Sequence, residues 1–242
     1  MSTSPKREPS KLNLLLAEFV QLGCLRGFLY FETYLRGREE LLLRVYNAGD
    51  SKSRVLSRAS STLDLARTAP REQLSARTRH LLLDFAAGQN PPASPCDREL
   101  ERDSSKTAFL IACYAKYNRP FVWIRSNQKR LIKVREDQKL ESDTPLKLNS
   151  TTAWATEDVK LYDLVTEVLS LILIPSPENP FAVDNAYWDT LPVEEAVMAT
   201  GAMMDFLQRV YYRNPPYSTK VMDDLMILYR KHFEYVEAIN RK

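Results

Sequence analysis

The residues able to carry out covalent chemistry are few and widely spaced along this chain. The two histidines are His80 and His232, and the three cysteines are Cys24, Cys96 and Cys113. Neither histidine stands near a nucleophile motif, and the HExxH and GxSxG patterns are absent. Because the cysteine count is odd and no CxxC pair occurs, we expect neither a disulfide framework nor a structural zinc site. A reducing, intracellular compartment, cytoplasm or nucleus, is the natural prediction.

Cofactor and metal sites are also disfavoured by the sequence. The chain has six glycines in 242 residues, and none of them forms a Walker loop or a GxGxxG turn that could cradle phosphates. Neighbouring carboxylates such as Glu39–Glu40 and Asp223–Asp224 are typical of a solvated helix face. We therefore predict a protein that is not an enzyme and has no cofactor, no metal and no catalytic residue.

A basic segment is the strongest functional signal in the sequence. The formal net charge of the chain is +3, but residues 116–139 carry +6 and residues 140–242 carry −7. Basic side chains neutralise phosphates, and interleaved aromatic rings can stack on unpaired bases. The residues predicted to bind nucleic acid or another polyanion are Lys116, Arg119, Arg125, Lys129, Arg130, Lys133, Arg135, Lys139 and Trp123. A solvated hairpin with a buried aromatic face is the alternative interpretation of the same pattern.

A second signal is the proline-rich stretch between Trp154 and Trp188. It reads as a capped helix, then three prolines in six residues, then an aromatic anchor. This order predicts a segment that docks one helix end rigidly. The residues predicted to contact a partner are Pro175, Pro177, Pro180, Phe181 and Trp188.

The elements that must position these residues are mostly helical. Residues 11–36 are apolar on more than one face and predict one long buried helix. Residues 39–46 and 107–117 fit either a helix or a strand. A β-hairpin is predicted near residues 119–135 because two β-rich runs flank a turn. The further predicted helices cover about residues 54–67, 70–87, 157–174 (capped by Thr156), 193–212 and 218–239.

These elements predict a mainly α protein with a small β element, of the α+β class. It would have a helical N-terminal lobe and a helical C-terminal region. The predicted domain organisation is a flexible arm at 1–10, a helical lobe at 11–88, a linker at 89–106, and a mixed α/β to helical lobe at 107–242. The most apolar stretch, Leu12 to Leu35, contains Glu18, Arg26 and Glu32, so no membrane span is expected.

The second half of the chain resembles the ubiquitin-conjugating enzyme (E2) family over about residues 105–210. Trp154, the following helix and the turn PSPENPF (175–181) are similar to that family's tryptophan, helix and proline-rich turn. Tyr117, Pro120 and Val122 stand for its YPxxPP region. The HPN tripeptide is missing, and no cysteine lies near residues 146–148, where the catalytic one would fall. Residues 1–100 show no sequence sign of the family's N-terminal helix and meander. The resemblance implies a cysteine-less variant that acts as a binding adaptor.

Together these observations predict a non-enzymatic scaffold or adaptor that works by protein–protein contact, either with another protein or by self-association into an oligomer. The alternative is a structural protein associated with RNA, of nucleocapsid or matrix type, that uses the basic segment 116–139. Salt dependence distinguishes the two, because phosphate contacts weaken steeply as ionic strength rises.

Overall fold

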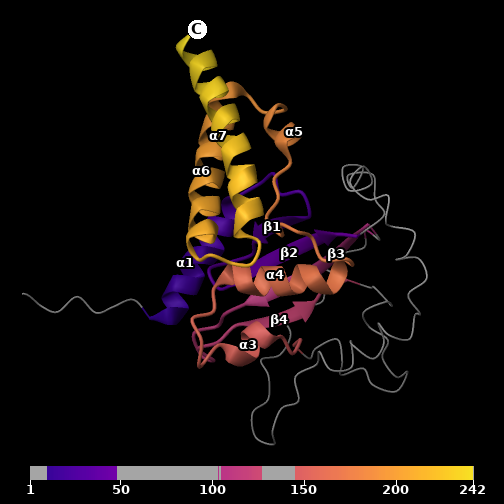
Figure 1. Ribbon diagram of the computed structural model, residues 1–242. Helices are drawn as coiled ribbons and strands as arrows, with labels where there is room; N and C mark the ends of the chain where they lie inside the picture. The colour runs from indigo at the N-terminus through magenta and orange to yellow at the C-terminus, as the bar shows by residue number, and fades with distance from the viewer. Residues whose placement is uncertain (1–9, 48–102, 104, 127–144, 242) are drawn as a thin grey trace, which may run out of the picture.

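The computed structural model describes residues 10–47, 103, 105–126 and 145–241. Ten named elements follow one another along this part of the chain (Figure 1). They are α1 Lys11–Cys24, β1 Phe31–Leu35, β2 Glu40–Tyr46, β3 Lys106–Ala112, β4 Phe121–Ile124, α3 Asn149–Ala153, α4 Leu161–Ile172, α5 Asn185–Trp188, α6 Val193–Tyr212 and α7 Ser218–Asn240. The α+β class is confirmed.

The four strands form one antiparallel sheet in the order β1-β2-β3-β4. Leu41 lies opposite Ile111, and Leu43 lies opposite Phe109, so residues far apart in sequence share one sheet. Nearly all of the linker predicted at 89–106 lies outside the described residues. The described parts on either side of it nevertheless contribute to the same sheet.

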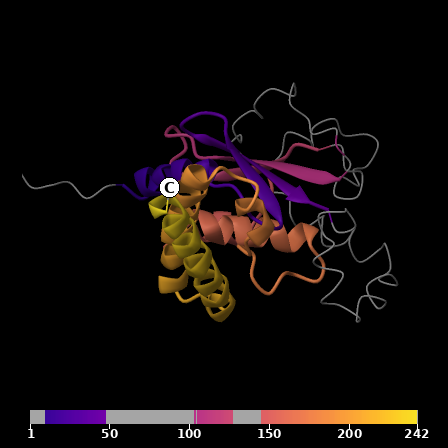
Figure 2. The same cartoon turned by 90° about the horizontal axis from the view of Figure 1, so that it is seen from above.

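The apolar periodicity of the chain explains how the helices cover this sheet. In α4 the buried residues follow the three-to-four spacing of one helix face: Leu161, Leu164, Val165, Val168, Leu169 and Ile172. Helix α1 buries Leu15, Phe19 and Leu22 against the same core. Figure 2 shows α4 and the α6–α7 pair on one side of the sheet, and in Figure 1 the C-terminal end of α7 points away from the strands.

Two predictions about element boundaries are wrong. The helix predicted over 11–36 ends at Cys24, and residues 31–35 form β1. A segment that is apolar on all sides fits a buried strand as well as a buried helix, and pairing with β2 decides in favour of the strand. Helix α4 begins at Leu161 and is not capped by Thr156. The open choices at 39–46 and 107–117 resolve as β2 and β3.

Other predicted elements fall partly or wholly outside the described residues. The helices at 54–67 and 70–87 and nearly all of the linker at 89–106 lie there, as does the second strand of the hairpin at 119–135. The first half of that hairpin is β4, which pairs with β3. Helices α6 and α7 match the predicted ranges to within one residue.

Candidate functional site

Two of the four described residues of the predicted basic surface are buried. Trp123 is 0% exposed and packs on the sheet face that also carries Leu110 and Phe121. Arg125 is 2% exposed. Neither placement fits the predicted role, because stacking on a base or neutralising a phosphate requires an accessible side chain.

The remaining predicted basic residues are divided between two regions. Lys116 is exposed and Arg119 is half-buried, both in the connection between β3 and β4. The others lie outside the described residues: Lys129, Arg130, Lys133, Arg135 and Lys139. The predicted nucleic-acid interface therefore stays a prediction for that segment.

The proline-rich turn docks into the core. Phe181 is 0% exposed, and its ring lies 6.0 Å from that of Phe31 and 5.4 Å from that of Phe206, measured between centroids. An isolated antiparallel β-bridge pairs Phe28 with Val183, which follows the turn. The docking role predicted for this stretch agrees with these contacts.

Several residues of the turn that were predicted to contact a partner are instead structural. Pro180, Phe181 and Trp188 are buried, whereas Pro177 is half-buried and Pro175 is exposed. The three buried residues act inside this chain, because their side chains are already covered by it.

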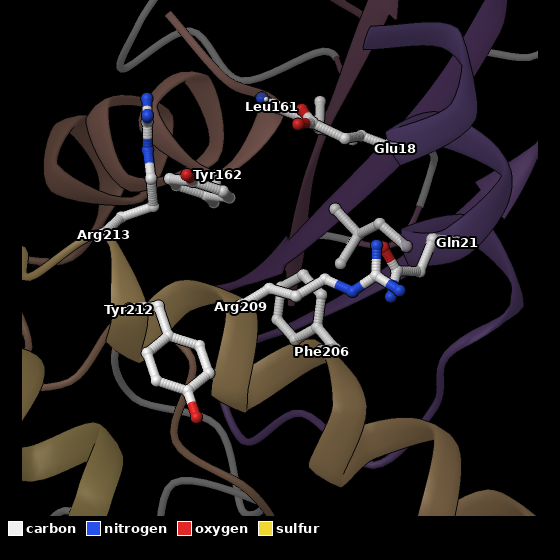
Figure 3. A pocket seen from close by; sticks show the side chains of 9 residues that line it. Glu18, Gln21, Leu161, Tyr162, Phe206, Arg209, Tyr212 and Arg213 are labelled. Carbon is white, nitrogen blue, oxygen red and sulfur yellow. Dashed lines mark hydrogen bonds between the residues drawn. The ribbon is translucent and has the colours of Figure 1, made fainter. Parts of the chain in front are cut away.

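A cavity of about 300 Å³ opens between α1, the start of α4 and the C-terminal end of α6 (Figure 3). Its sides combine apolar carbon with a few polar groups, the composition typical of a binding pocket. The lining residues are Glu18, Gln21, Leu22, Leu161, Tyr162, Phe206, Arg209, Tyr212 and Arg213. We refer to this cavity as the α1–α6 pocket.

Glu18 is the polar residue that joins two of the pocket's walls. Its Oε2 accepts a hydrogen bond of 2.7 Å from the backbone N–H of Leu161, in the first turn of α4. The first N–H groups of a helix have no partner within the helix, so this carboxylate supplies one from another element. Burial raises the pKa of Glu18 above its ordinary value, and the bond from Leu161 opposes that shift only in part.

A second carboxylate completes the capping of α4. Asp163 Oδ2 accepts a hydrogen bond of 2.8 Å from the N–H of Lys160. Burial raises the pKa of Asp163 as well. Glu18 and Asp163 thus satisfy neighbouring amides at the end of the helix, and this explains why α4 begins at Leu161.

The two arginines of the pocket are fixed by ion pairs at its rim. Arg213 donates from Nη1 to Oδ2 of Asp158 and from Nη2 to its carbonyl oxygen, both at 2.8 Å. Arg209 lies 3.0 Å from a carboxylate oxygen of Asp205, which also accepts a 2.9 Å bond from Gln21. The rim is therefore cross-linked between α1 and α6, although each of these exposed pairs contributes little stability by itself.

Reactive side chains elsewhere in the described structure are poorly placed for chemistry. Burial raises the pKa of the Cys113 thiol to about 12, which leaves almost no thiolate at neutral pH. Nδ1 of His232 lies 2.8 Å from the Thr200 hydroxyl. His80 is outside the described residues. Within the described ranges, no three histidine, cysteine or acidic side chains gather as metal ligands would.

The α1–α6 pocket was missed by sequence reasoning, although one signal for it was present. Glu18 stands among apolar residues in the stretch Leu12 to Leu35, and a charge on a buried helix face needs a partner. That partner, the N–H of Leu161, lies 143 residues away along the chain.

Over the described residues, no helix has both the length and the apolar character needed to span a membrane.

Comparison with known proteins gives one match. No curated protein and no solved structure matches the chain significantly. Residues 94–234, more than half of the chain, match a family described as a domain of unknown function (DUF7886). The match includes α4 and α6 with the pocket residues they carry, whereas Glu18, Gln21 and Leu22 on α1 precede it. The chain therefore belongs to the DUF7886 family.

Proposed function

We propose that this protein is a non-enzymatic adaptor that binds a partner protein through the surface around the α1–α6 pocket. The observation that carries the proposal is the pocket itself, an apolar cavity of about 300 Å³ whose rim is fixed by ion pairs. A preformed pocket of this kind holds the anchor side chain of a partner without the entropic cost of ordering the site.

The surface beside the pocket has the composition of a protein interface. Tyr212, at the rim, is 79% exposed. Tyrosine and arginine are the residues most often enriched in binding hot spots. Tyr212, Arg209 and Arg213 all stand at the C-terminal end of α6, so one helix end presents the contact residues.

The chemistry of the pocket agrees with binding rather than turnover. Its described lining contains no serine, cysteine, histidine or lysine, the usual nucleophiles and proton carriers. The one acidic group of the described lining, the half-buried Glu18, already accepts a backbone hydrogen bond. Burial raises the pKa of the Tyr162 hydroxyl, which leaves almost no nucleophilic phenolate at neutral pH, and the arginines stay protonated.

The resemblance to the ubiquitin-conjugating enzymes supports the same proposal. Over the span of the resemblance, about residues 105–210, the described chain has strands β3 and β4, then α3 and α4, then the proline-rich turn, and this order agrees with the resemblance. In the region where that family's catalytic cysteine would fall, Leu146 and Leu148 are 2% and 0% exposed. We interpret this as an adaptor built on such a framework without the thiol.

Site-specific photo-crosslinking tests the proposal. A photoreactive phenylalanine analogue replaces Tyr212 at the rim, and the matched control replaces Met198, which is 70% exposed and lies about 21 Å away along the same helix. Each variant is expressed in cells of the source organism and irradiated. We expect a discrete protein adduct from position 212 and none from position 198. An adduct with the mass of two copies of the chain would identify self-association as the contact.

Two results would count against the adaptor proposal. One is a set of identical adduct patterns from both positions, because specific docking must depend on place. The other is tight binding of a labelled single-stranded RNA that falls steeply with salt, because it would favour the nucleic-acid alternative.

A further inference from the structure

The size and the walls of the α1–α6 pocket restrict what can fill it. A volume of about 300 Å³ is at the lower end of the range for ligand pockets, which suits one large side chain or one bicyclic ring. Leu22, Leu161 and Phe206 supply the apolar part of the lining, together with the rings of Tyr162 and Tyr212. Figure 3 shows the Tyr162 ring close to Arg213. A flat apolar group fits these walls better than a chain of polar atoms.

Glu18 adds one specific requirement. Its Oε2 accepts the N–H of Leu161, and among the described residues no donor reaches its Oε1. A carboxylate is a hydrogen-bond acceptor only. An occupant that donates one N–H or O–H into the pocket therefore gains a charge-assisted hydrogen bond, and one without a donor leaves the oxygen unpaired.

The charges around the pocket favour a neutral occupant. Arg209 and Arg213 stand at the rim and repel a cation, although each is paired with an aspartate. Glu18 repels an anion inside the pocket. A neutral group that is aromatic and carries a donor satisfies all of these conditions.

We infer that the α1–α6 pocket takes the indole ring of a tryptophan from the partner protein, with the indole N–H donating to Oε1 of Glu18. The indole nitrogen is a donor and never an acceptor, which matches a carboxylate. A tryptophan side chain also buries more apolar surface than any other residue, and the guanidinium groups at the rim attract its ring face. This inference rests on the proposed adaptor function, because it names the anchor that the partner supplies.

A matched pair of small molecules tests the inference on the full-length purified chain. Indole and 1-methylindole have nearly the same shape, but only indole has the N–H donor. Titration of the ¹⁵N-labelled protein, followed by two-dimensional NMR, measures the affinity and the location of each probe. We expect indole to shift the amide signals of Leu22, Leu161 and Phe206, and to bind about tenfold more tightly than 1-methylindole.

Glu18→Gln provides the decisive variant. The glutamine keeps a carbonyl oxygen for the N–H of Leu161 and turns an NH₂ group, a donor, toward the pocket. In this variant indole and 1-methylindole should bind with about the same affinity, while the NMR signals of residues outside the pocket stay unchanged. Glu195→Gln, an exposed glutamate in the first turn of α6, is the control and should keep the wild-type preference.

The outcomes separate this inference from the adaptor proposal. Equal affinity for the two probes, or an indole preference that survives Glu18→Gln, would overturn the predicted hydrogen bond. Absence of indole binding together with a specific adduct at position 212 would overturn the tryptophan anchor and leave the adaptor standing. Selective indole binding without any adduct would support the pocket chemistry and reject the adaptor.

Discussion

Replacing Glu18 by alanine tests whether this carboxylate joins α1 to the start of α4. In the folded protein Glu18 accepts the N–H of Leu161 at 2.7 Å, where the helix itself offers no acceptor. Alanine removes the acceptor and leaves the amide beside the apolar lining of the pocket. This single change removes the cap on the Leu161 N–H and the hydrogen bond between α1 and α4, whereas the Asp163 cap on Lys160 remains.

The expected loss follows from the groups left unpaired. Removal of a capping acceptor costs about 0.5–2 kcal/mol, and an unpaired buried amide costs about 1–3 kcal/mol. Two effects reduce this loss: water reaches the half-buried site, and alanine relieves the desolvation that raises the pKa of Glu18. We expect a net loss of about 1–2 kcal/mol in the free energy of unfolding. For a chain of this length the melting temperature would fall by roughly 2–8 °C.

Glu18→Gln separates the hydrogen bond from the charge. Glutamine keeps the acceptor, so its stability at neutral pH should lie within about 0.5 kcal/mol of the wild type. The folded state raises the pKa of Glu18 above 4.5 and thus holds the proton more tightly than the unfolded chain. The wild type should therefore gain stability relative to Glu18→Gln as the pH falls toward 4.5, and lose that gain as the pH rises through the folded pKa.

Thermal and urea unfolding of the three proteins, between about pH 4.5 and about pH 8, measure these differences. An alanine variant that melted at the same temperature as the wild type and the glutamine variant would show that Glu18 does not cap α4. A wild type that became less stable than Glu18→Gln on acidification would refute the direction of the pKa shift.

Three further predictions concern the core and the cysteines. Phe181→Ala removes a ring that contacts Phe28, Phe31 and Phe206, so urea unfolding should show a loss of about 3–5 kcal/mol in the free energy of unfolding. The control Phe233→Ala changes an exposed residue and should cost under about 0.5 kcal/mol. Similar losses for the two variants would contradict the docked turn. Gly27→Ala introduces a Cβ 2.8 Å from the Trp188 ring at a φ of +89°, so it should lower the free energy of unfolding by about 1–3 kcal/mol. Gly37→Ala, which has open space around the added Cβ, should not lower it. Equal stability of the two variants would argue against the close approach of Gly27 to Trp188. Iodoacetamide should modify the exposed Cys24 in the folded protein, and peptide mass mapping identifies the labelled cysteine. Cys113 should react only after denaturant is added, because burial raises the pKa of its thiol to about 12. Labelling of Cys113 in the folded protein would disprove this protection.

The helices near the C-terminus were predictable because their signals are local. Apolar residues recur at helical spacing in α6 and α7, and prolines mark the turns before each of them. The apolar face of α4 and its end before Pro175 follow from the same kind of pattern. Its first residue does not, because Glu18, on a distant helix, supplies the acceptor for Leu161.

The exposure of the aromatic residues was the least predictable property. Trp123, Phe181 and Trp188 were expected to meet a base or a partner, yet each is at most 1% exposed. Basic neighbours suggest a surface, and prolines suggest a turn, but burial depends on which other elements cover the residue. That covering is set by contacts between segments far apart in the chain.

The sequence by itself determined the α+β class, the two long C-terminal helices and the scarcity of reactive side chains, because composition and short-range periodicity record these properties directly. Only the tertiary structure decided that residues 31–35 form a strand, that this strand joins one sheet with residues 40–46, 106–112 and 121–124, and that Glu18 meets Leu161 beside a pocket. The physical reason is that strand pairing and pocket formation depend on contacts between distant segments, and a local pattern of residues does not specify which segments meet.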